Sequence, residues 1–301
     1  MTAQQPTSWQ GELLHHEMMS KHTSWRVGGP ADSYYKPLDL DDLCVFLEQL
    51  AMDEPLTWLG LGSNLLVRDG GIRGTVISTS GLLNNISLLN ETELYVEAGV
   101  SCAKVARFAA RQNLTGVEFL AGIPGTMGGA LAMNAGAFGG ETWSNVKQVT
   151  TLSRTGMRMT HDRDDYQIGY RSVKGPEGEW FVSAVLSLTH GDVDAGQIRI
   201  KQLLTKRAET QPTKQASCGS VFRNPEGDHA ARLIETAGLK ATCIGGACVS
   251  EKHANFIVNT GDARAADIEA LIEKVAETVQ QQHGVALQRE VHIIGEAEVN
   301  A

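Results

Sequence analysis

The chain has 301 residues, of which 42% are hydrophobic and 20% charged, and its formal net charge at pH 7 is −9. This length allows two or three domains with a large core. An acidic chain without a Lys/Arg cluster argues against nucleic acid or an anionic membrane surface as the main partner. The N-terminus has no signal-peptide pattern and no apolar run approaches a membrane span, so we expect a cytoplasmic protein.

The predicted elements of the first eighty residues alternate between strand and helix. A Gly-Gly-Pro turn within residues 23–36 leads into a strand, and Asp39 or Asp41 caps an amphipathic helix over residues 40–52. Two short apolar strands follow, at residues 56–59 and 75–80. The order strand, helix, strand is typical of an α/β unit.

The loop after the first of these apolar strands begins like a dinucleotide-binding fingerprint. Leu65 stands where the third glycine belongs, however, and no helix pattern follows, so the usual Rossmann interpretation fails. Two glycines beside a short polar pair can still hold a pyrophosphate, and a simple Gly/Asn turn is the alternative. The candidate cofactor-contacting residues of this loop are Gly60, Gly62, Ser63, Asn64 and Leu65.

A strand over residues 94–100 and a Ser101-capped helix to Gln112 precede the most unusual stretch, residues 116–140. Eight of its residues are glycine and only one is charged. Its bare amides can point at phosphate oxygens, and a helix beginning near Thr126 adds its positive end. A buried Gly/Ala crossover is the alternative. The candidate cofactor-contacting residues here are Gly122, Ile123, Pro124, Gly125, Thr126, Gly128, Gly129 and Asn134.

The second half of the chain is predicted as strands followed by helices. Strands are expected at residues 146–154, 158–161, 180–188, 255–258 and 285–295, with Thr155-Gly156 as a hairpin turn. Helices are expected at residues 197–210, 228–237 and 267–283, the last ended by Gly284. A polar, turn-rich stretch at residues 211–225 places a domain boundary just before it.

The five cysteines of the chain are scattered and odd in number. A disulfide framework is disfavoured in this context. Cys243 and Cys248 do not have a usual zinc spacing, and no His/Cys pair completes a site. We therefore predict reduced, mostly buried thiols and no metal site.

Eight segments of the sequence carry a resemblance to one family. They are HTSWRVGGPAD (22–32), LGLGSNLLV (59–67), AGIPGTMGGALAMNAGAFGGE (121–141), YR (170–171), SCGSVFRNP (217–225), ARLIETAGLK (231–240), HANFIVN (253–259) and REVHIIGE (289–296). Together they resemble the UDP-N-acetylenolpyruvoylglucosamine reductase family over nearly the whole chain. The glycine-rich segment also occurs in wider flavoproteins of the vanillyl-alcohol-oxidase type, so the Ser-Val-Phe-Arg-Asn-Pro run makes the assignment narrower.

This resemblance implies an α+β fold. A two-subdomain FAD-binding part of the vanillyl-alcohol-oxidase type is expected to precede a C-terminal α+β substrate-binding domain. The expected divisions are residues 1–80, 81–205 and 206–301, with the last strand able to return to the FAD-binding part. The length resembles the shorter form of the family, which lacks an inserted segment carrying a substrate-handling tyrosine.

The resemblance also implies an enzyme of peptidoglycan precursor synthesis, and so of cell wall biogenesis, cell shape and cell division. NADPH is expected to reduce non-covalently bound FAD, and UDP-N-acetylglucosamine enolpyruvate is then reduced to UDP-N-acetylmuramate. Negative charge develops on C2 and its carboxylate, so the reaction needs electrostatic stabilisation and a proton donor at C2. No nucleic-acid or membrane partner is expected, and a monomer is expected.

The catalytic residues that the resemblance assigns are Arg171, Ser220 and Glu290. A guanidinium can fork onto a carboxylate and stays charged throughout. Ser220 matches the proton donor, a role that requires a positive environment or a water relay. Glu290 would hold the carboxylate end of the intermediate, either protonated or paired with Arg171. The plain alternatives are a surface arginine beside a turn, a serine in a glycine turn and an edge-strand glutamate.

Four further residues are candidates for holding the substrate. Asn224 resembles the substrate-contacting asparagine of the family, and Gln211 is expected to assist it. Lys206 and Arg207 are candidate partners of the UDP diphosphate, although solvation on a helix surface is the commoner fate of such residues.

Three residues near these motifs have a less defined role. Cys218 is interpreted as a bystander, and His253 as either a ligand-facing residue or a satisfied strand-end histidine. Val173 stands where the family usually has a small hydroxyl residue. Two other functions are kept as alternatives: a flavin oxidase of the wider fold and a non-catalytic flavin-binding protein. Residues 58–72 contain neither the His nor the Cys that many such oxidases use to tether FAD.

Overall fold

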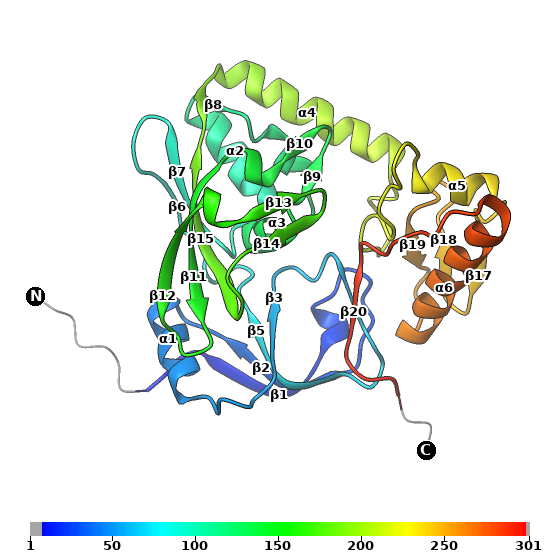
Figure 1. Ribbon diagram of the computed structural model, residues 1–301, viewed down its shortest axis with the longest axis horizontal. Helices are drawn as coiled ribbons and strands as arrows, with labels where there is room; N and C mark the ends of the chain where they lie inside the picture. The colour runs from blue at the N-terminus through cyan, green and yellow to red at the C-terminus, as the bar shows by residue number, and fades with distance from the viewer. Residues whose placement is uncertain (1–7, 299–301) are drawn as a thin grey trace, which may run out of the picture. The chain divides into compact units, whose positions relative to one another are not determined.

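The computed structural model describes residues 8–298, which form two compact units that interleave along the chain (Figure 1). Unit 1 comprises residues 8–14, 33–61 and 74–205. Unit 2 comprises residues 15–32, 62–73 and 206–298.

A four-stranded sheet of order β1-β2-β5-β3 contains the first predicted strands. Its strands are β1 (Glu12–Met18), β2 (Pro30–Lys36), β3 (Leu56–Leu59) and β5 (Ile72–Ser78). Helix α1 (Leu40–Gln49) begins at its expected cap, because the Asp39 side chain accepts a hydrogen bond of 2.9 Å from the Asp42 backbone. β3 and β5 run parallel, and the segment between them contains β4 and no helix.

An antiparallel five-stranded sheet of order β12-β11-β15-β7-β6 supports the core of unit 1. Its strands are β6 (Ile86–Leu88), β7 (Glu93–Glu97), β11 (Val146–Ser153), β12 (Arg158–Asp162) and β15 (Glu179–Ser187). Helix α2 (Cys102–Arg111) is capped by Ser101 as predicted and buries Val105, Ala106 and Ala109. These residues pack with Val96, Ala184 and Leu186 of the sheet in one hydrophobic cluster.

The glycine-rich stretch forms short elements rather than one long helix or strand. They are the 3-10 helix η2 (Glu118–Gly122), α3 (Met127–Ala132), β9 (Gly136–Ala137) and β10 (Gly140–Glu141), and β8 (Leu114–Thr115) precedes them. Helix α3 follows Thr126, where a helix start was predicted. The later elements of unit 1 are β13 (Gln167–Gly169), β14 (Ser172–Lys174) and β16 (Thr189–His190), and α4 (Val193–Thr210) follows.

In unit 2, two helices lie beside a three-stranded sheet of order β17-β18-β19 (Figure 1). The strands are β17 (Cys243–Ile244), β18 (Ala247–Val249) and β19 (Ile257–Asn259), and the helices are α5 (Ala230–Thr236) and α6 (Ala265–His283). Gly284 ends α6 in the left-handed conformation, with φ +70°, as predicted. Ile268, Leu271 and Val275 of α6 are buried in the hydrophobic cluster of this unit.

The predicted strand over residues 285–295 is wrong in length. Only β20 (His292–Ile294) is a strand, and it pairs in parallel with β4 (Leu65–Val67). The ladder stops there because β4 has three residues. Residues 285–291 form no strand, and their pairing with residues 221–223 amounts to an isolated bridge between Arg289 and Phe222 and its flanking backbone hydrogen bonds.

The prediction of reduced thiols is wrong for one pair, since Cys243 and Cys248 form a disulfide. Gly245 and Gly246 make a two-residue turn that places the two cysteines opposite each other on β17 and β18, with Cα atoms 4.1 Å apart. Such closeness is typical of antiparallel pairs without mutual hydrogen bonds. The prediction of reduced, buried thiols is confirmed for Cys44, Cys102 and Cys218.

This pairing predicts the thiol content of the protein. Unfolded without reductant, the chain should titrate three thiols, and five after reduction. The Cys243→Ser variant is the control, because releasing Cys248 should add one thiol to the unreduced count. Five thiols in the unreduced wild-type chain would contradict the disulfide.

A buried carboxylate ties the start of unit 1 to α1. Asp42 is 3% exposed and accepts hydrogen bonds from the Tyr35 hydroxyl and from the backbone amides of Gln10, Gly11 and Leu38. Burial alone would raise the pKa of this carboxyl, but these hydrogen bonds outweigh it and hold the pKa below its ordinary value.

We therefore expect Asp42→Asn to lower the free energy of unfolding at pH 7 by about 2 kcal/mol, because the amide keeps one acceptor oxygen and the donors to the other oxygen then face an NH2 group. The depressed pKa gives a stabilisation that is complete above the unfolded pKa of about 4 and is lost as pH falls through the folded pKa. Thermal unfolding should thus show a large difference at pH 7 and a smaller one near pH 3. Asp53→Asn, at an exposed position, is the control and should change neither.

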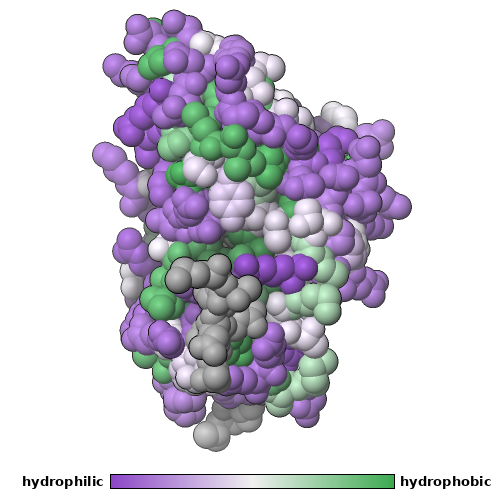
Figure 2. All heavy atoms as spheres, turned by 90° about the vertical axis from the view of Figure 1, so that its left-hand side faces the viewer, coloured by the Kyte–Doolittle hydropathy of each residue, from purple (hydrophilic) through white to green (hydrophobic). Residues whose placement is uncertain are grey.

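The surface of the described residues carries scattered apolar side chains. Figure 2 shows one face on which hydrophilic residues predominate and hydrophobic ones form smaller groups. None of the helices between residues 8 and 298 is long and apolar enough to cross a membrane.

Candidate functional site

Two predicted cofactor loops touch within unit 1. A Cβ on Gly60 would lie 2.5 Å from Oγ1 of Thr126, so only glycine allows this approach. Thr126 is 2% exposed, and its hydroxyl has no hydrogen-bond partner among the described residues. Because a buried hydroxyl normally finds a partner, this one remains available to a bound group.

The glycines of the second loop differ in what they are needed for. A Cβ on Gly122 would lie 2.6 Å from the Phe138 ring, and one on Gly128 would lie 2.9 Å from Ala98. These two glycines allow close packing. Gly129 is exposed, and its Cβ would meet only Thr126 Oγ1, at 3.9 Å. The backbone at Gly129 is therefore bare on its open side, as the approach of a flat or phosphorylated ligand requires.

The other part of the first loop belongs to unit 2. Gly62 has φ +63°, and a Cβ there would lie 2.1 Å from the His22 carbonyl oxygen. The Asn64 side chain donates a hydrogen bond of 3.1 Å to the Glu290 backbone oxygen, and the Asn64 backbone carbonyl accepts one of 3.1 Å from the His292 amide. The loop is thus fastened to the segment that carries the predicted catalytic glutamate.

Arg171 occupies a two-residue turn between β13 and β14, with φ +52°. Its Nη2 donates to the Gly136 carbonyl at 2.8 Å and its Nη1 to the Asn134 carbonyl at 3.3 Å. The guanidinium lies 5.3 Å from the centre of the Tyr170 ring. The arginine is beside a turn, as one interpretation held, but its side chain is oriented by backbone carbonyls near β9.

Asn134 supports this arrangement from a fully buried position. Its side-chain amide donates to Glu141 at 3.0 Å and to the Gly169 carbonyl at 3.1 Å, and its side-chain oxygen accepts from Trp143 at 3.1 Å. The side chain is therefore engaged within unit 1, and its predicted contact with a cofactor stays a prediction.

In unit 2, a backbone hydrogen bond connects the segment that carries Ser220 to the segment that carries Glu290. Ser220 precedes Val221, whose carbonyl accepts a hydrogen bond of 2.8 Å from the Glu290 amide. The alternative interpretation of Glu290 as an edge-strand glutamate is wrong, because the residue lies before β20 and outside any strand.

Cys218 and His253 lie near these residues in unit 2. Burial raises the pKa of the Cys218 thiol to about 12, so the thiolate is disfavoured and the bystander interpretation fits. Burial also lowers the pKa of His253, whose Nδ1 accepts from the Asn255 amide at 3.3 Å and whose ring packs on Phe256. A satisfied, neutral histidine is the interpretation that these contacts favour.

The predicted substrate residues are partly engaged. The Asn224 side-chain oxygen accepts from the Ala230 amide at 3.1 Å, at the start of α5. Gln211 accepts from Arg207 Nε at 3.3 Å. Burial lowers the pKa of the Arg207 guanidinium. Arg207 is thus half-buried beside a neutral partner and is not a fully solvated residue of the helix surface. A cation in such a place favours the binding of an anionic ligand.

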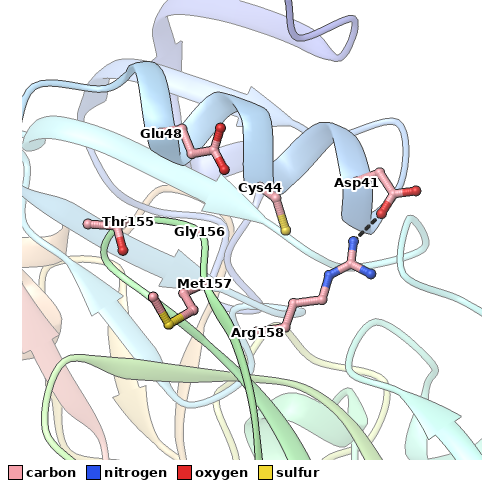
Figure 3. A pocket seen from close by; sticks show the side chains of 7 residues that line it. All are labelled: Asp41, Cys44, Glu48, Thr155, Gly156, Met157 and Arg158. Carbon is pink, nitrogen blue, oxygen red and sulfur yellow. Dashed lines mark hydrogen bonds and ion pairs between the residues drawn. The ribbon is translucent and has the colours of Figure 1, made fainter. Parts of the chain in front are cut away.

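A pocket of about 400 Å³ lies elsewhere in unit 1, between α1 and the β11–β12 turn (Figure 3). Asp41, Cys44 and Glu48 line it from α1, opposite residues 155–158, and Arg158 forms an ion pair with Asp41. None of the predicted site residues lines it. Between residues 8 and 298, no three His, Cys, Asp or Glu side chains are grouped to hold a metal ion.

Comparisons with known proteins agree with these observations. A family model described as the C-terminal domain of UDP-N-acetylenolpyruvoylglucosamine reductase matches residues 211–294, and an FAD binding domain model matches residues 32–161. The reductases of that name from Alkalilimnicola ehrlichii and Methylococcus capsulatus are each 60% identical to this chain. The two alignments cover 96% of this chain, and 96% and 95% of the respective relative. A solved reductase from Thermus caldophilus is 32% identical, with TM-score 0.81 over 94% of this chain and 98% of that one.

The open side of Gly129 gives a test of where the cofactor lies. In Gly129→Ala the new Cβ meets no protein atom closer than 3.9 Å, and alanine favours a helix, so the apoprotein should be at least as stable as wild type. The affinity for FAD should nevertheless fall, because the methyl group stands over the bare backbone. Fluorescence titration of the apoprotein with FAD measures the affinity, and thermal unfolding without FAD measures the stability. Unchanged affinity would place the cofactor elsewhere.

Proposed function

The chain belongs to the UDP-N-acetylenolpyruvoylglucosamine reductase family, and from this we propose that it reduces UDP-N-acetylglucosamine enolpyruvate to UDP-N-acetylmuramate with NADPH, through FAD. The observation that carries the proposal is 60% identity to reductases of this name over 96% of the chain. This extent favours the reductase over a flavin oxidase or a non-catalytic flavin protein. The product is a precursor of peptidoglycan, and so of the cell wall that sets cell shape and accompanies division.

The residues of the predicted cofactor loops fit FAD. Bound there, FAD supplies hydride chemistry that no amino-acid side chain provides. Gly60, Thr126 and Gly129 of unit 1 would hold it through bare amides and short polar groups. Gly62 and Asn64 stay predicted cofactor contacts. Binding is non-covalent in this proposal, because residues 58–72 contain no His or Cys.

Arg171 would stabilise the charge that develops on the carboxylate of the enolpyruvyl group. Its guanidinium remains cationic at any working pH, and two backbone carbonyls hold it in place before substrate arrives. Such preorganised charge is worth more in the transition state than the same charge in water, because it needs no reorientation.

Ser220 would deliver the proton to C2, and Glu290 would orient the carboxylate end. A serine hydroxyl is a weak acid, so its proton transfer depends on a nearby positive charge or a water relay. Glu290 must be protonated or paired with a cation to act beside a carboxylate, since two like charges would repel. Both depend on the pairing of Val221 with the Glu290 backbone for their positions.

The nucleotide part of the substrate would contact residues near the end of α4. Arg207, with Lys206 and Gln211, would bind the diphosphate, and Asn224 would contact the substrate beyond it. We further propose that the protein is a cytoplasmic monomer without a nucleic-acid or membrane partner. The division of the chain at residues 80 and 205 stays a prediction.

Separate half-reactions test this proposal. When the yellow protein is reduced anaerobically with NADPH and then mixed with the enolpyruvyl sugar nucleotide, stopped-flow absorbance should show the flavin reoxidised by that substrate. In Ser220→Ala, reduction by NADPH should keep its wild-type rate, because no proton reaches C2 in that step. Reoxidation by the substrate should slow by about 10²–10⁴-fold, the usual value of a positioned proton donor.

Ser217→Ala is the matched control, in the same loop, and should leave both half-reactions near wild type. A wild-type flavin that NADPH reduces but the substrate does not reoxidise would overturn the proposed function. Normal reoxidation in Ser220→Ala would remove only the role of Ser220.

A further inference from the structure

One buried amide side chain in unit 2 holds the backbone that follows Ser220. Asn255 is 3% exposed. Its side-chain oxygen accepts from the Phe222 amide at 3.0 Å, and its side-chain nitrogen donates to the Phe222 carbonyl at 2.8 Å. Its own backbone carbonyl accepts from the Val221 amide at 2.9 Å. Three hydrogen bonds thus connect a single residue to two consecutive residues.

The opposite side of the same backbone carries the predicted catalytic glutamate. The Val221 carbonyl accepts from Glu290 at 2.8 Å and from Val291 at 3.3 Å, and the Arg223 amide donates to Gln288 at 2.9 Å. Residues 221–223 therefore run between Asn255 on one side and residues 288–291 on the other. A shift of Phe222 would move Ser220 through the chain and Glu290 through the Val221 carbonyl.

We propose that Asn255 is a positioning residue for the substrate half of the reaction, an inference that rests on the proposed function. It touches neither of the proposed catalytic side chains in the hydrogen bonds described. It acts by fixing, in one rigid pairing, the backbones from which Ser220 and Glu290 project. Misplacement of a reacting group by about 1 Å can lower a rate about 10²-fold, so a small backbone shift is enough.

A purely structural asparagine is the competing explanation, because removal of Asn255 leaves buried polar groups of Phe222 without partners. Both explanations predict a lower melting temperature. Only positioning predicts an uneven effect on the half-reactions, since Ser220 and Glu290 serve the reduction of the substrate and not the reduction of FAD by NADPH.

The test compares the two half-reactions in Asn255→Ala holoenzyme. Reduction by NADPH should stay within about twofold of wild type, and reoxidation by the substrate should slow by about 10–100-fold. Asn259→Ala is the matched control. Its side chain donates to the Trp25 carbonyl at 2.8 Å and accepts from the amides of Gly261 and Ala263, so its loss removes a similar set of bonds in the same unit. It should lower the melting temperature without unbalancing the half-reactions.

Asn255→Asp adds a pH readout. Protonated, the carboxyl has one donor and one acceptor, like the amide; ionised, it has two acceptors and faces the Phe222 carbonyl with a negative charge. The reoxidation rate of this variant, divided by that of wild type at each pH, should therefore rise as pH falls, while the same ratio for NADPH reduction stays flat.

Equal slowing of both half-reactions in Asn255→Ala, or none, would overturn the inference. This failure is distinguishable from failure of the proposed function, because Ser220→Ala reports on the function independently. If Ser220→Ala slows reoxidation and Asn255→Ala does not, then the function stands and the positioning role falls.

Discussion

Unit 2 depends on one constraint: buried backbone amides and carbonyls need hydrogen-bond partners even where no regular strand is present. Residues 217–229 and 284–291 contain neither helix nor strand, yet Val221 and Phe222 are each 1% exposed. Buried amides and carbonyls without a ladder must find other partners. They find them in Asn255 and in residues 288–291, so hydrogen bonds hold this irregular segment on both sides. Reactive side chains can then stand on loops without being loosely held.

The glycines of the cofactor loops fulfil two different requirements. Gly60, Gly122 and Gly128 allow protein atoms to approach one another, whereas Gly129 is open. Composition alone does not distinguish a glycine needed for close packing from one that leaves the backbone open to a ligand. A packed Gly/Ala crossover and a ligand-binding loop were therefore both compatible with the sequence. The structure shows close packing at Gly122 and Gly128 and a bare edge at the neighbouring Gly129, and the use of that edge by a ligand stays a prediction.

Features set by neighbours in the sequence were predictable, and features set by distant pairing were not. The caps at Asp39, Ser101 and Gly284 are local, and each lies where the pattern placed it. The length of β20 depends on β4, more than two hundred residues earlier, so its own composition could not limit it. The same holds for the site. Motifs indicated Arg171, Ser220 and Glu290. The hydrogen bond of Asn255 to Phe222 joins residues far apart in the sequence, so no local pattern indicated it.

The interleaved order of the two units has a consequence for synthesis on the ribosome. Residues 15–32 and 62–73 emerge early, but their partners in unit 2 follow residue 205. Trp25 donates its indole hydrogen bond to Ile257, and β4 pairs with β20 near the end of the chain. A nascent chain that has completed unit 1 therefore carries apolar side chains of unit 2, Trp25 and Leu66 among them, with nothing yet made to bury them. Contacts of such long sequence separation also close slowly, so the early segments depend on the last residues translated to reach their folded state.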